Sequence, residues 1–224
     1  MIDYLANFFS DYGPDLARAT LDTLLAVFIS TALAYLIGLL LAVLMKVTAP
    51  GSLKPQPVMN AILGWVINMG RSIPFVILMV WLIVLSRLIV GTSLGVRGSI
   101  IPLSLGAAPF VARLVEQSFS ELPAGRIEAA QACGASTWQV IWKVYLRESL
   151  PSLVRGAAIT IITLIGYQAI MGALGNGGLG DLAIRFGFYR FQTNVMVASV
   201  IILIILVQII QSVADLIARR IDKR

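Results

Sequence analysis

The sequence contains no histidine and a single cysteine, Cys133. Without imidazole there is no His-ligated metal site, no histidine-based catalysis and no histidine pH switch. One thiol forms neither an intrachain disulfide nor a cysteine cluster for zinc or iron–sulfur. The sequence also lacks His-Glu-x-x-His and Gly-x-Ser-x-Gly motifs. The residues with which an intramembrane enzyme would carry out metal or serine catalysis are therefore missing. We expect no catalytic residue and no metal site.

Charge is also scarce. Of 224 residues, 12% are charged and 58% are apolar, whereas a soluble domain has about 25% charged and 45–50% apolar residues. Seventeen Lys and Arg and eleven Asp and Glu are too few to coat a soluble globule of this length. The composition predicts an integral membrane protein. Its fold class is all-α and polytopic, with one transmembrane domain over residues 1–224.

The apolar residues come in five blocks of membrane-spanning length. A bilayer core of ~30 Å needs about 20 helical residues. The blocks are residues 20–45, 58–86, 98–115, 153–174 and 195–216. The third is short and holds Pro102 and Pro109, but its small residues let neighbouring helices approach. We therefore predict five transmembrane helices and one long polar segment, residues 116–152.

The basic residues predict the orientation of these helices. With the N-terminus outside, five lie in outer segments: Arg18, Arg87, Arg97, Arg185 and Arg190. Eleven lie in inner segments: Lys46, Lys54, Arg113, Arg126, Lys143, Arg147, Arg155, Arg219, Arg220, Lys223 and Arg224. This excess follows the positive-inside rule, so we expect a cytoplasmic C-terminus and a cytoplasmic segment 116–152. Because the basic residues are scattered, we expect no nucleic-acid partner. The acidic start of the chain argues against a cleaved signal peptide.

Proline, glycine and capping residues in the segment 116–152 predict two short helices. Pro123 can occupy the first position of the first helix, and Gly134 can end it. Ser136 and Gln139 have the spacing of a capping box that opens the second. At helical spacing, four large residues share one face of the second helix: Trp138, Ile141, Trp142 and Tyr145. Such a pair either lies on lipid headgroups or docks a partner protein.

Part of this segment resembles the EAA loop of bacterial ABC importer permeases. Glu128-Ala129-Ala130, three residues, and Gly134 match the family pattern, and Leu146 fits its second half. Arg147 stands where the family has proline, although Leu150-Pro151 follows shortly after. The resemblance implies a type I importer fold and a coupling helix held in a cleft of a separate ATPase. The residues implied in coupling are Glu128, Ala129, Ala130, Gly134, Trp138 and Leu146.

Other runs are similar to the methionine-uptake permeases of that superfamily. They are Arg-Ser-Ile-Pro-Phe at 71–75, Ile-Val-Gly-Thr-Ser-Leu-Gly at 89–95, Gly-Ala-Ala-Pro-Phe-Val-Ala-Arg at 106–113, and Gly-Asn-Gly-Gly-Leu-Gly at 175–180. The resemblance implies a permease subunit that carries L- and D-methionine by alternating access; another amino acid is the alternative. A gradient-driven secondary transporter is a weaker one, because the chain lacks a clear inverted repeat and a carboxylate relay.

The same resemblance implies the partners. They are a second copy of the chain, two cytoplasmic ABC ATPase subunits, a periplasmic or lipid-anchored substrate-binding protein, and the lipid of the bacterial inner membrane. The chain has no Gly-x-x-x-x-Gly-Lys-Ser/Thr loop, so we expect no cofactor here and ATP and Mg on the partner ATPase.

Four residues are candidates for the pore or its gate: Arg71, Pro74, Tyr167 and Gln168. Arg71 lies thirteen residues past Val58 in the second block, and an intramembrane charge faces either a water-filled path or a neighbouring helix. Tyr167 and Gln168 either line a path or make an inter-helix hydrogen bond. The Gly-x-Gly-x-x-Gly run at 175–180 follows an apolar block rather than a strand, so we expect a flexible outer loop instead of a dinucleotide site.

Overall fold

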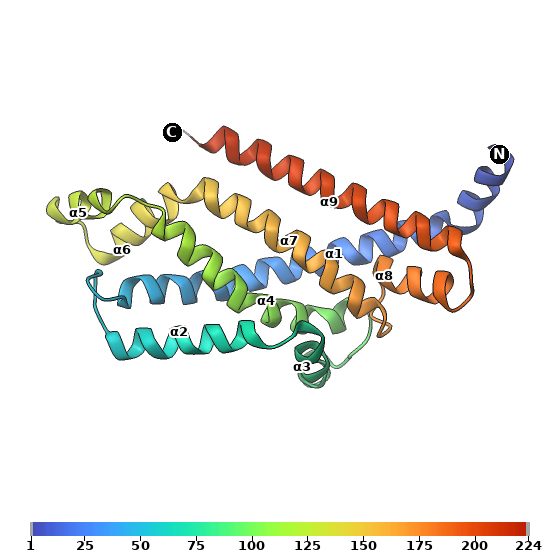
Figure 1. The fold of residues 1–224 in the computed structure, drawn as a ribbon, viewed down its shortest axis with the longest axis horizontal. Helices are drawn as coiled ribbons and strands as arrows, with labels where there is room; N and C mark the ends of the chain where they lie inside the picture. Colours follow the sequence, from blue (N-terminus) through green and yellow to red (C-terminus); the bar gives the residue numbers. More distant parts are fainter. Residues whose placement is uncertain (1, 223–224) are drawn as a thin grey trace. The chain divides into compact units, whose positions relative to one another are not determined.

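The computed structural model describes residues 2–222, with side chains described from residue 7, and these residues form helices and no strand. Figure 1 labels the α-helices in chain order, and two π-helical segments, η1 and η2, lie among them. The elements are α1 (Ile2–Thr48), α2 (Pro57–Ser72), α3 (Phe75–Val90), α4 (Gly95–Ser120), α5 (Ala124–Ala132), α6 (Thr137–Val140), η1 (Ile141–Leu146), α7 (Leu150–Gly172), α8 (Gly178–Leu182), η2 (Ala183–Phe188) and α9 (Thr193–Ile221). The predicted all-α class is confirmed.

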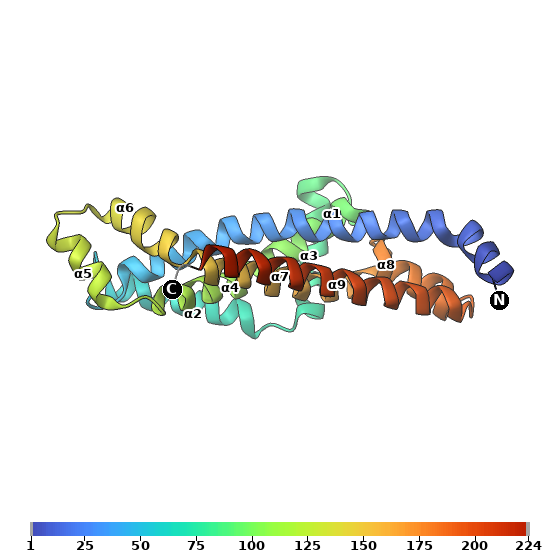
Figure 2. The same cartoon turned by 90° about the horizontal axis from the view of Figure 1, so that it is seen from above.

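Within the part of the chain that the structure describes, four helices are long and apolar enough to cross a bilayer: α1, α4, α7 and α9. α1, α4 and α9 contain the predicted first, third and fifth blocks, and α7 covers the fourth, predicted for 153–174, except for its last two residues. α1 is the longest, with 47 residues and Pro14 inside it, and Figure 2 shows its N-terminal end bent away from the rest of the helix. Its residues are about twice the number needed to cross a bilayer core.

The second block is not the single helix that we predicted for residues 58–86. It consists of α2 and α3, which are bent by 103° at the short break between them. Pro74 causes the bend, because proline has no N–H to continue a helix and forces the preceding residue into an extended conformation. Ile73 accordingly has a ψ of 124°. Each helix has 16 residues, about 24 Å, and the pair counts as one broken span or a re-entrant loop.

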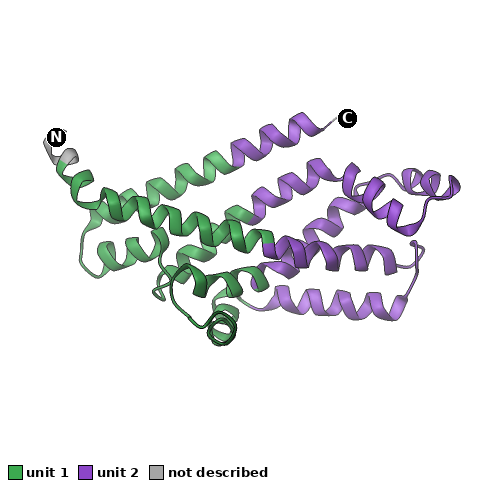
Figure 3. Ribbon diagram, turned by 180° about the vertical axis from the view of Figure 1, so that it is seen from behind, with its two compact units in different colours: residues 1–32, 74–105, 161–210 green, residues 33–73, 106–160, 211–224 purple. Residues whose placement is uncertain are grey.

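The chain forms two compact units, which Figure 3 colours separately. The first contains residues 1–32, 74–105 and 161–210, and the second contains residues 33–73, 106–160 and 211–224. In the first unit, Leu16 and Ala19 of α1 pack against Leu179, Leu182 and Val195. In the second, the core includes three residues from three helices: Met45, Ile67 and Ala112. α1, α4, α7 and α9 each contribute residues to both units.

The glycine-rich run at 175–180, which we predicted to be a flexible outer loop, packs within the first unit through its second half. Gly178 and Leu179 are buried, and the Leu179 N–H donates a 2.9 Å hydrogen bond to Oγ1 of Thr23 on α1. A Cβ on Gly178 would lie 2.7 Å from the same Thr23 oxygen. Small residues are needed here because the backbone lies directly against α1.

Gly180 gives a test of this packing. A Cβ at this position would collide with the backbone of Ala169 on α7, and backbone cannot swing aside. Gly180→Ala should therefore destabilise the protein by about 1–3 kcal/mol, seen as a lower thermal midpoint in tryptophan fluorescence of the detergent-purified protein. Gly166→Ala is the matched control on α7, because nothing lies within 4 Å of its Cβ. An unchanged midpoint for Gly180→Ala would contradict the close contact.

Candidate functional site

The segment between α4 and α7 contains two helices, as its proline, glycine and capping residues predict. α5 begins directly after Pro123, which is its N-cap rather than its first helical residue. Gly134 has a φ of +76°, the left-handed conformation that lets the chain reverse after α5. The capping box at the start of α6 is confirmed: Oε1 of Gln139 accepts from the Ser136 N–H at 2.8 Å, and Oγ of Ser136 accepts from the Gln139 N–H at 3.4 Å.

The Glu-Ala-Ala run lies on α5 at the surface. Glu128 and Ala129 are exposed and Ala130 is half-buried. Glu128 lines a cavity of about 220 Å³ together with Lys46, the turn at residues 49–53, and Tyr145. No ion pair of Glu128 is found among the described residues. The carboxylate therefore stands at the rim of a small cleft between α5 and the α1–α2 turn, within reach of a donor from another molecule.

The second helix does not have the single large apolar face that we predicted. Ile141 and Tyr145 are buried, whereas Trp138 and Trp142 are 65% and 54% exposed and meet edge to face at 5.6 Å. Residues 141–146 form the π-helix η1, whose wider i→i+5 turn breaks the 3.6-residue spacing on which the prediction relied. The two tryptophans are thus a separate, exposed pair.

Tyr145 connects this segment to α4. Its ring lies 5.3 Å from that of Phe119, and burial raises the pKa of the Tyr145 phenol above its ordinary value, because the charged form loses its hydration. Tyr145 therefore acts as a neutral packing residue. Leu146, the last residue of η1, is half-buried.

Arg147 does not interrupt the helix, although it stands in place of a proline in the pattern described above. Its φ of −70° and ψ of −40° are helical, and its N–H bonds to the carbonyl of Val144. The Leu150-Pro151 pair instead marks the start of α7. The chain therefore passes from the exposed segment into α7 through a change of helix type rather than through a proline break.

Polar contacts fix both ends of the segment. Arg126 of α5 forms an ion pair with Glu148, just after η1. Oγ of Ser149 donates to the carbonyl of Ser118 on α4 at 3.1 Å, and Ser152 bonds to both the Ser118 hydroxyl and Glu121. Single exposed ion pairs contribute little stability. Together, these contacts hold the segment to the end of α4 while leaving α5 and the tryptophan pair at the surface.

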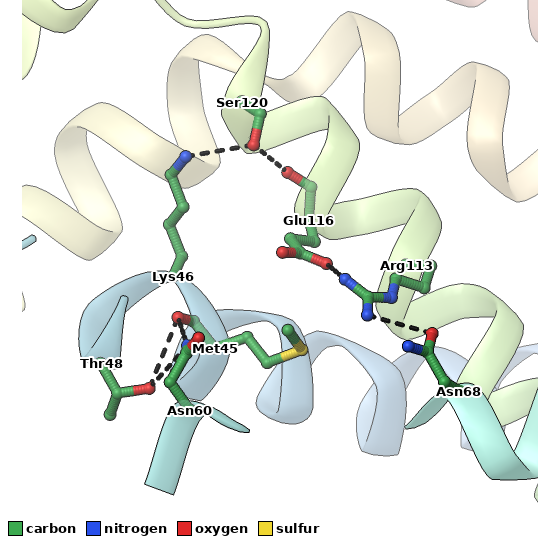
Figure 4. A network of polar contacts seen from close by, with 8 residues as sticks. All are labelled: Met45, Lys46, Thr48, Asn60, Asn68, Arg113, Glu116 and Ser120. Atoms are coloured by element: carbon green, nitrogen blue, oxygen red, sulfur yellow. Dashed lines mark hydrogen bonds and ion pairs between the residues drawn. The ribbon is translucent and has the colours of Figure 1, made fainter. Parts of the chain in front are cut away.

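A second polar network joins α1, α2 and α4, and Figure 4 shows it. The Arg113 guanidinium bonds to Glu116 at 2.6 Å and to Oδ1 of Asn68 at 3.1 Å. Lys46 donates to Ser120 at 3.1 Å, and Asn60 donates to the carbonyl of Met45 at 2.7 Å. Sequence reasoning did not find this network. The i,i+3 spacing of Arg113 and Glu116 was a signal, but nothing marked Asn68 as their partner.

The four pore candidates have different surroundings. Arg71 lies in the last turn of α2 and is exposed, and Pro74 caps α3 on the other side of the bend. The ring of Phe75, the first residue of α3, stacks on Tyr167 with centroids 3.7 Å apart. Gln168 is buried, and its Nε2 is 3.5 Å from the carbonyl of Gly177. Tyr167 and Gln168 thus bind the α3 start and the glycine-rich segment to α7.

The described residues contain no group of three or more Cys, Asp and Glu that could hold a metal ion. The exposed segment instead carries a carboxylate at a cleft, the two alanines that follow it and a pair of exposed indoles.

Residues 34–224 match the family model described as "Binding-protein-dependent transport system inner membrane component". The chain belongs to this family. It is therefore a membrane permease component of an inner-membrane transport system, with several apolar helices.

Curated relatives match between 70% and 98% of this chain. It is 45% identical over 220 residues to the "Probable D-methionine transport system permease protein MetI" of Vibrio cholerae, covering 98% of both chains. It is 46% identical over 157 residues to the D-methionine transport system permease protein MetI of Escherichia coli strain K12, covering 70% of this chain and 72% of the relative.

Solved structures share the fold. A structure described as an inward-facing conformation of the MetNI methionine ABC transporter matches with a TM-score of 0.93 and 43% identity, covering 95% of this chain and 99% of that one. An amino acid ABC transporter with histidines matches with a TM-score of 0.77 at 17% identity, covering 95% of this chain and 96% of that one. At that identity the second match establishes the fold alone.

The capping box predicts a local effect. Ser136→Ala removes the side-chain acceptor of the Gln139 N–H, which costs about 1 kcal/mol of helix stability. Hydrogen exchange of the α6 amides should therefore become roughly fivefold faster, as measured by mass spectrometry on the protein in nanodiscs. Ser136→Asp keeps an acceptor at the N-cap and should exchange at about the wild-type rate. Equal acceleration in both variants would show that the cap does not stabilise α6.

Proposed function

We propose that this chain is the transmembrane permease subunit of an ATP-binding-cassette importer for methionine, in its L and D forms. The observation that carries the proposal is its 45% identity to a D-methionine transport permease over 98% of both chains. The high structural match to a methionine ABC transporter supports it further. Residues 1–224 act as one translocation domain, and transport proceeds by alternating access driven by a separate ATPase.

The α5–η1 segment is the proposed coupling element. Glu128, Ala129 and Ala130 on α5 form the contact face, the small alanines allow close approach, and the Glu128 carboxylate accepts from a basic group of the ATPase. Gly134 makes the reversal, while exposed Trp138 and half-buried Leu146 belong to the following helix. The Arg126–Glu148 ion pair and the Ser149–Ser118 hydrogen bond support this role. A coupling element must be attached to the spanning helices that it moves.

The proposed assembly contains two copies of this chain, two cytoplasmic ATPase subunits and a periplasmic or lipid-anchored substrate-binding protein. ATP and Mg bind to the ATPase, since this chain has no phosphate-binding loop. Two coupling segments related by two-fold symmetry match a symmetric ATPase pair.

The residues proposed for the substrate path or its gate are Arg71, in the last turn of α2, and Pro74, Tyr167 and Gln168 of the first unit. Within that unit, the ring of Phe75 stacks on Tyr167. An exposed cation suits a water-filled path better than contact with lipid, and aromatic rings make favourable contacts with a thioether. Gln168 contributes by holding the glycine-rich segment.

Uptake in proteoliposomes tests the proposed function. Vesicles that contain this chain, its ATPase and its binding protein should accumulate radiolabelled L-methionine only with internal ATP, and excess unlabelled D- or L-methionine should compete. Competition by a different amino acid alone would redirect the substrate assignment. Uptake driven by an ion gradient without the ATPase would instead favour a secondary transporter.

The same vesicles test the coupling element. Glu128→Gln should lower uptake about 10- to 100-fold, because a charge-assisted contact contributes roughly 1.5–3 kcal/mol. Glu121→Gln is the control, since Glu121 bonds within the chain to Ser152 and should change uptake less than threefold. Wild-type uptake by Glu128→Gln would remove this residue from the coupling contact.

The proposed orientation places the N-terminus outside and the C-terminus in the cytoplasm. The only cysteine, Cys133, is exposed in the coupling segment, so a membrane-impermeant maleimide should label it only after cells are permeabilised. Leu94→Cys in a Cys133→Ser background is the opposite marker: Leu94 is exposed between α3 and α4 and should be labelled in intact cells. The reverse pattern would invert the topology.

A further inference from the structure

Residues 188–191, from the last residue of η2 to the turn before α9, carry exposed aromatic and basic side chains and are here called the aromatic loop. Phe188, Tyr189 and Phe191 are 67%, 69% and 87% exposed, and Arg190 is exposed beside them. The Phe188 and Tyr189 rings meet edge to face at 5.4 Å. Tyr, Phe and Arg are enriched in protein interfaces, and Tyr and Arg in their energetic hot spots.

The backbone of the aromatic loop is held in an unfavourable conformation. Phe191 has a φ of +58°, the only positive value of a non-glycine residue among those that the structure describes. Such a conformation persists only where the surroundings impose it, and it occurs often at functional sites. The Gln192 N–H donates to the carbonyl of Phe186 at 3.0 Å, and the Arg190 guanidinium lies 4.6 Å from the Phe186 ring. The contacts of Arg190 and Gln192 with Phe186 therefore hold the aromatic loop against η2.

A polar cavity of about 520 Å³ lies beside the aromatic loop, lined by Phe191 and by residues at the starts of α1 and α9. Its polar lining residues are Asn7, Asp11, Tyr12, Gln192, Thr193 and Asn194. Oε1 of Gln192 is buried without a hydrogen-bond partner, and the exposed Asp11 carries a carboxylate. Because the Gln192 oxygen has almost no accessible surface, the exposed Asp11 carboxylate is the group that fits a Lys or Arg side chain from another molecule.

We propose that the aromatic loop and this cavity dock the substrate-binding protein. The aromatic side chains seat in an apolar hollow of that protein, and one of its Lys or Arg side chains enters the cavity. This inference rests on the proposed function and orientation. The family description requires a binding protein, and the loop follows α7, so one crossing separates it from the coupling segment. A lipid-facing anchor would need neither the strained Phe191 nor a carboxylate, which repels phosphate headgroups.

The experiment titrates the cognate binding protein against the complex of this chain and its ATPase in nanodiscs, with ATP hydrolysis as the readout. Phe191→Asn removes the ring but keeps a residue that tolerates the left-handed conformation. Asp11→Asn removes the carboxylate from an exposed position on α1. Each should raise the binding-protein concentration for half-maximal stimulation at least tenfold, and neither should change basal hydrolysis without binding protein.

Phe9→Ala is the control, because Phe9 is an exposed aromatic residue of α1 outside the lining of the polar cavity, and it should shift the half-maximal concentration less than twofold. Unchanged concentrations in both test variants would overturn the docking proposal. So would a loss of thermal stability without a shift in concentration, which indicates an anchor in the lipid interface. Wild-type complex that the binding protein does not stimulate, and that takes up no methionine, would contradict the proposed function itself.

Discussion

A backbone inside a bilayer has no water to bond to, and this constraint governs the whole fold. The four spanning helices satisfy it by their own hydrogen bonds, and the interruptions satisfy it locally. At the bend before α3, the carbonyl of Pro74 accepts from the N–H groups of Ile77 and Leu78. Buried hydroxyls also return to backbone carbonyls of their own helix, as Thr160 and Ser199 do. The non-helical backbone before α3 thus has hydrogen-bond partners within the protein.

The parts of the fold that depend on local sequence could be predicted. Long apolar blocks locate the spanning helices, and Ser136 with Gln139 locates the start of α6. Parts that depend on tertiary contacts could not. The sequence shows that Pro74 interrupts the second apolar block, but it does not predict the 103° bend between α2 and α3. The Arg113–Asn68 contact joins residues 45 positions apart, and no periodicity signals it. The helical wheel grouped Trp138 and Trp142 with Ile141 and Tyr145, but only the latter two are buried. A wheel does not contain the neighbouring helix, here Phe119 of α4 against Tyr145.

The exposed segment between α4 and α7 divides its residues between anchoring and recognition. Its buried residues, Ile141 and Tyr145, and its base contacts at Ser149 and Arg126 face the protein. Glu128 and the tryptophan pair face outward. The hydrogen bonds of Ser149 and Ser152 thus join the segment to the end of α4, while its outward-facing residues make no contact with that helix among the interactions described.

The π-helix η1 makes chain length matter more than residue identity at this point. A turn closed by i→i+5 hydrogen bonds contains one more residue than an α-helical turn, and each residue of an α-helix rotates the chain by about 100°. Deleting one residue from Ile141–Leu146 would let the turn return to α-helical spacing and would rotate Trp138 by about 100° around the axis relative to α7. We therefore expect related chains to vary in side chains along this stretch while avoiding insertions and deletions.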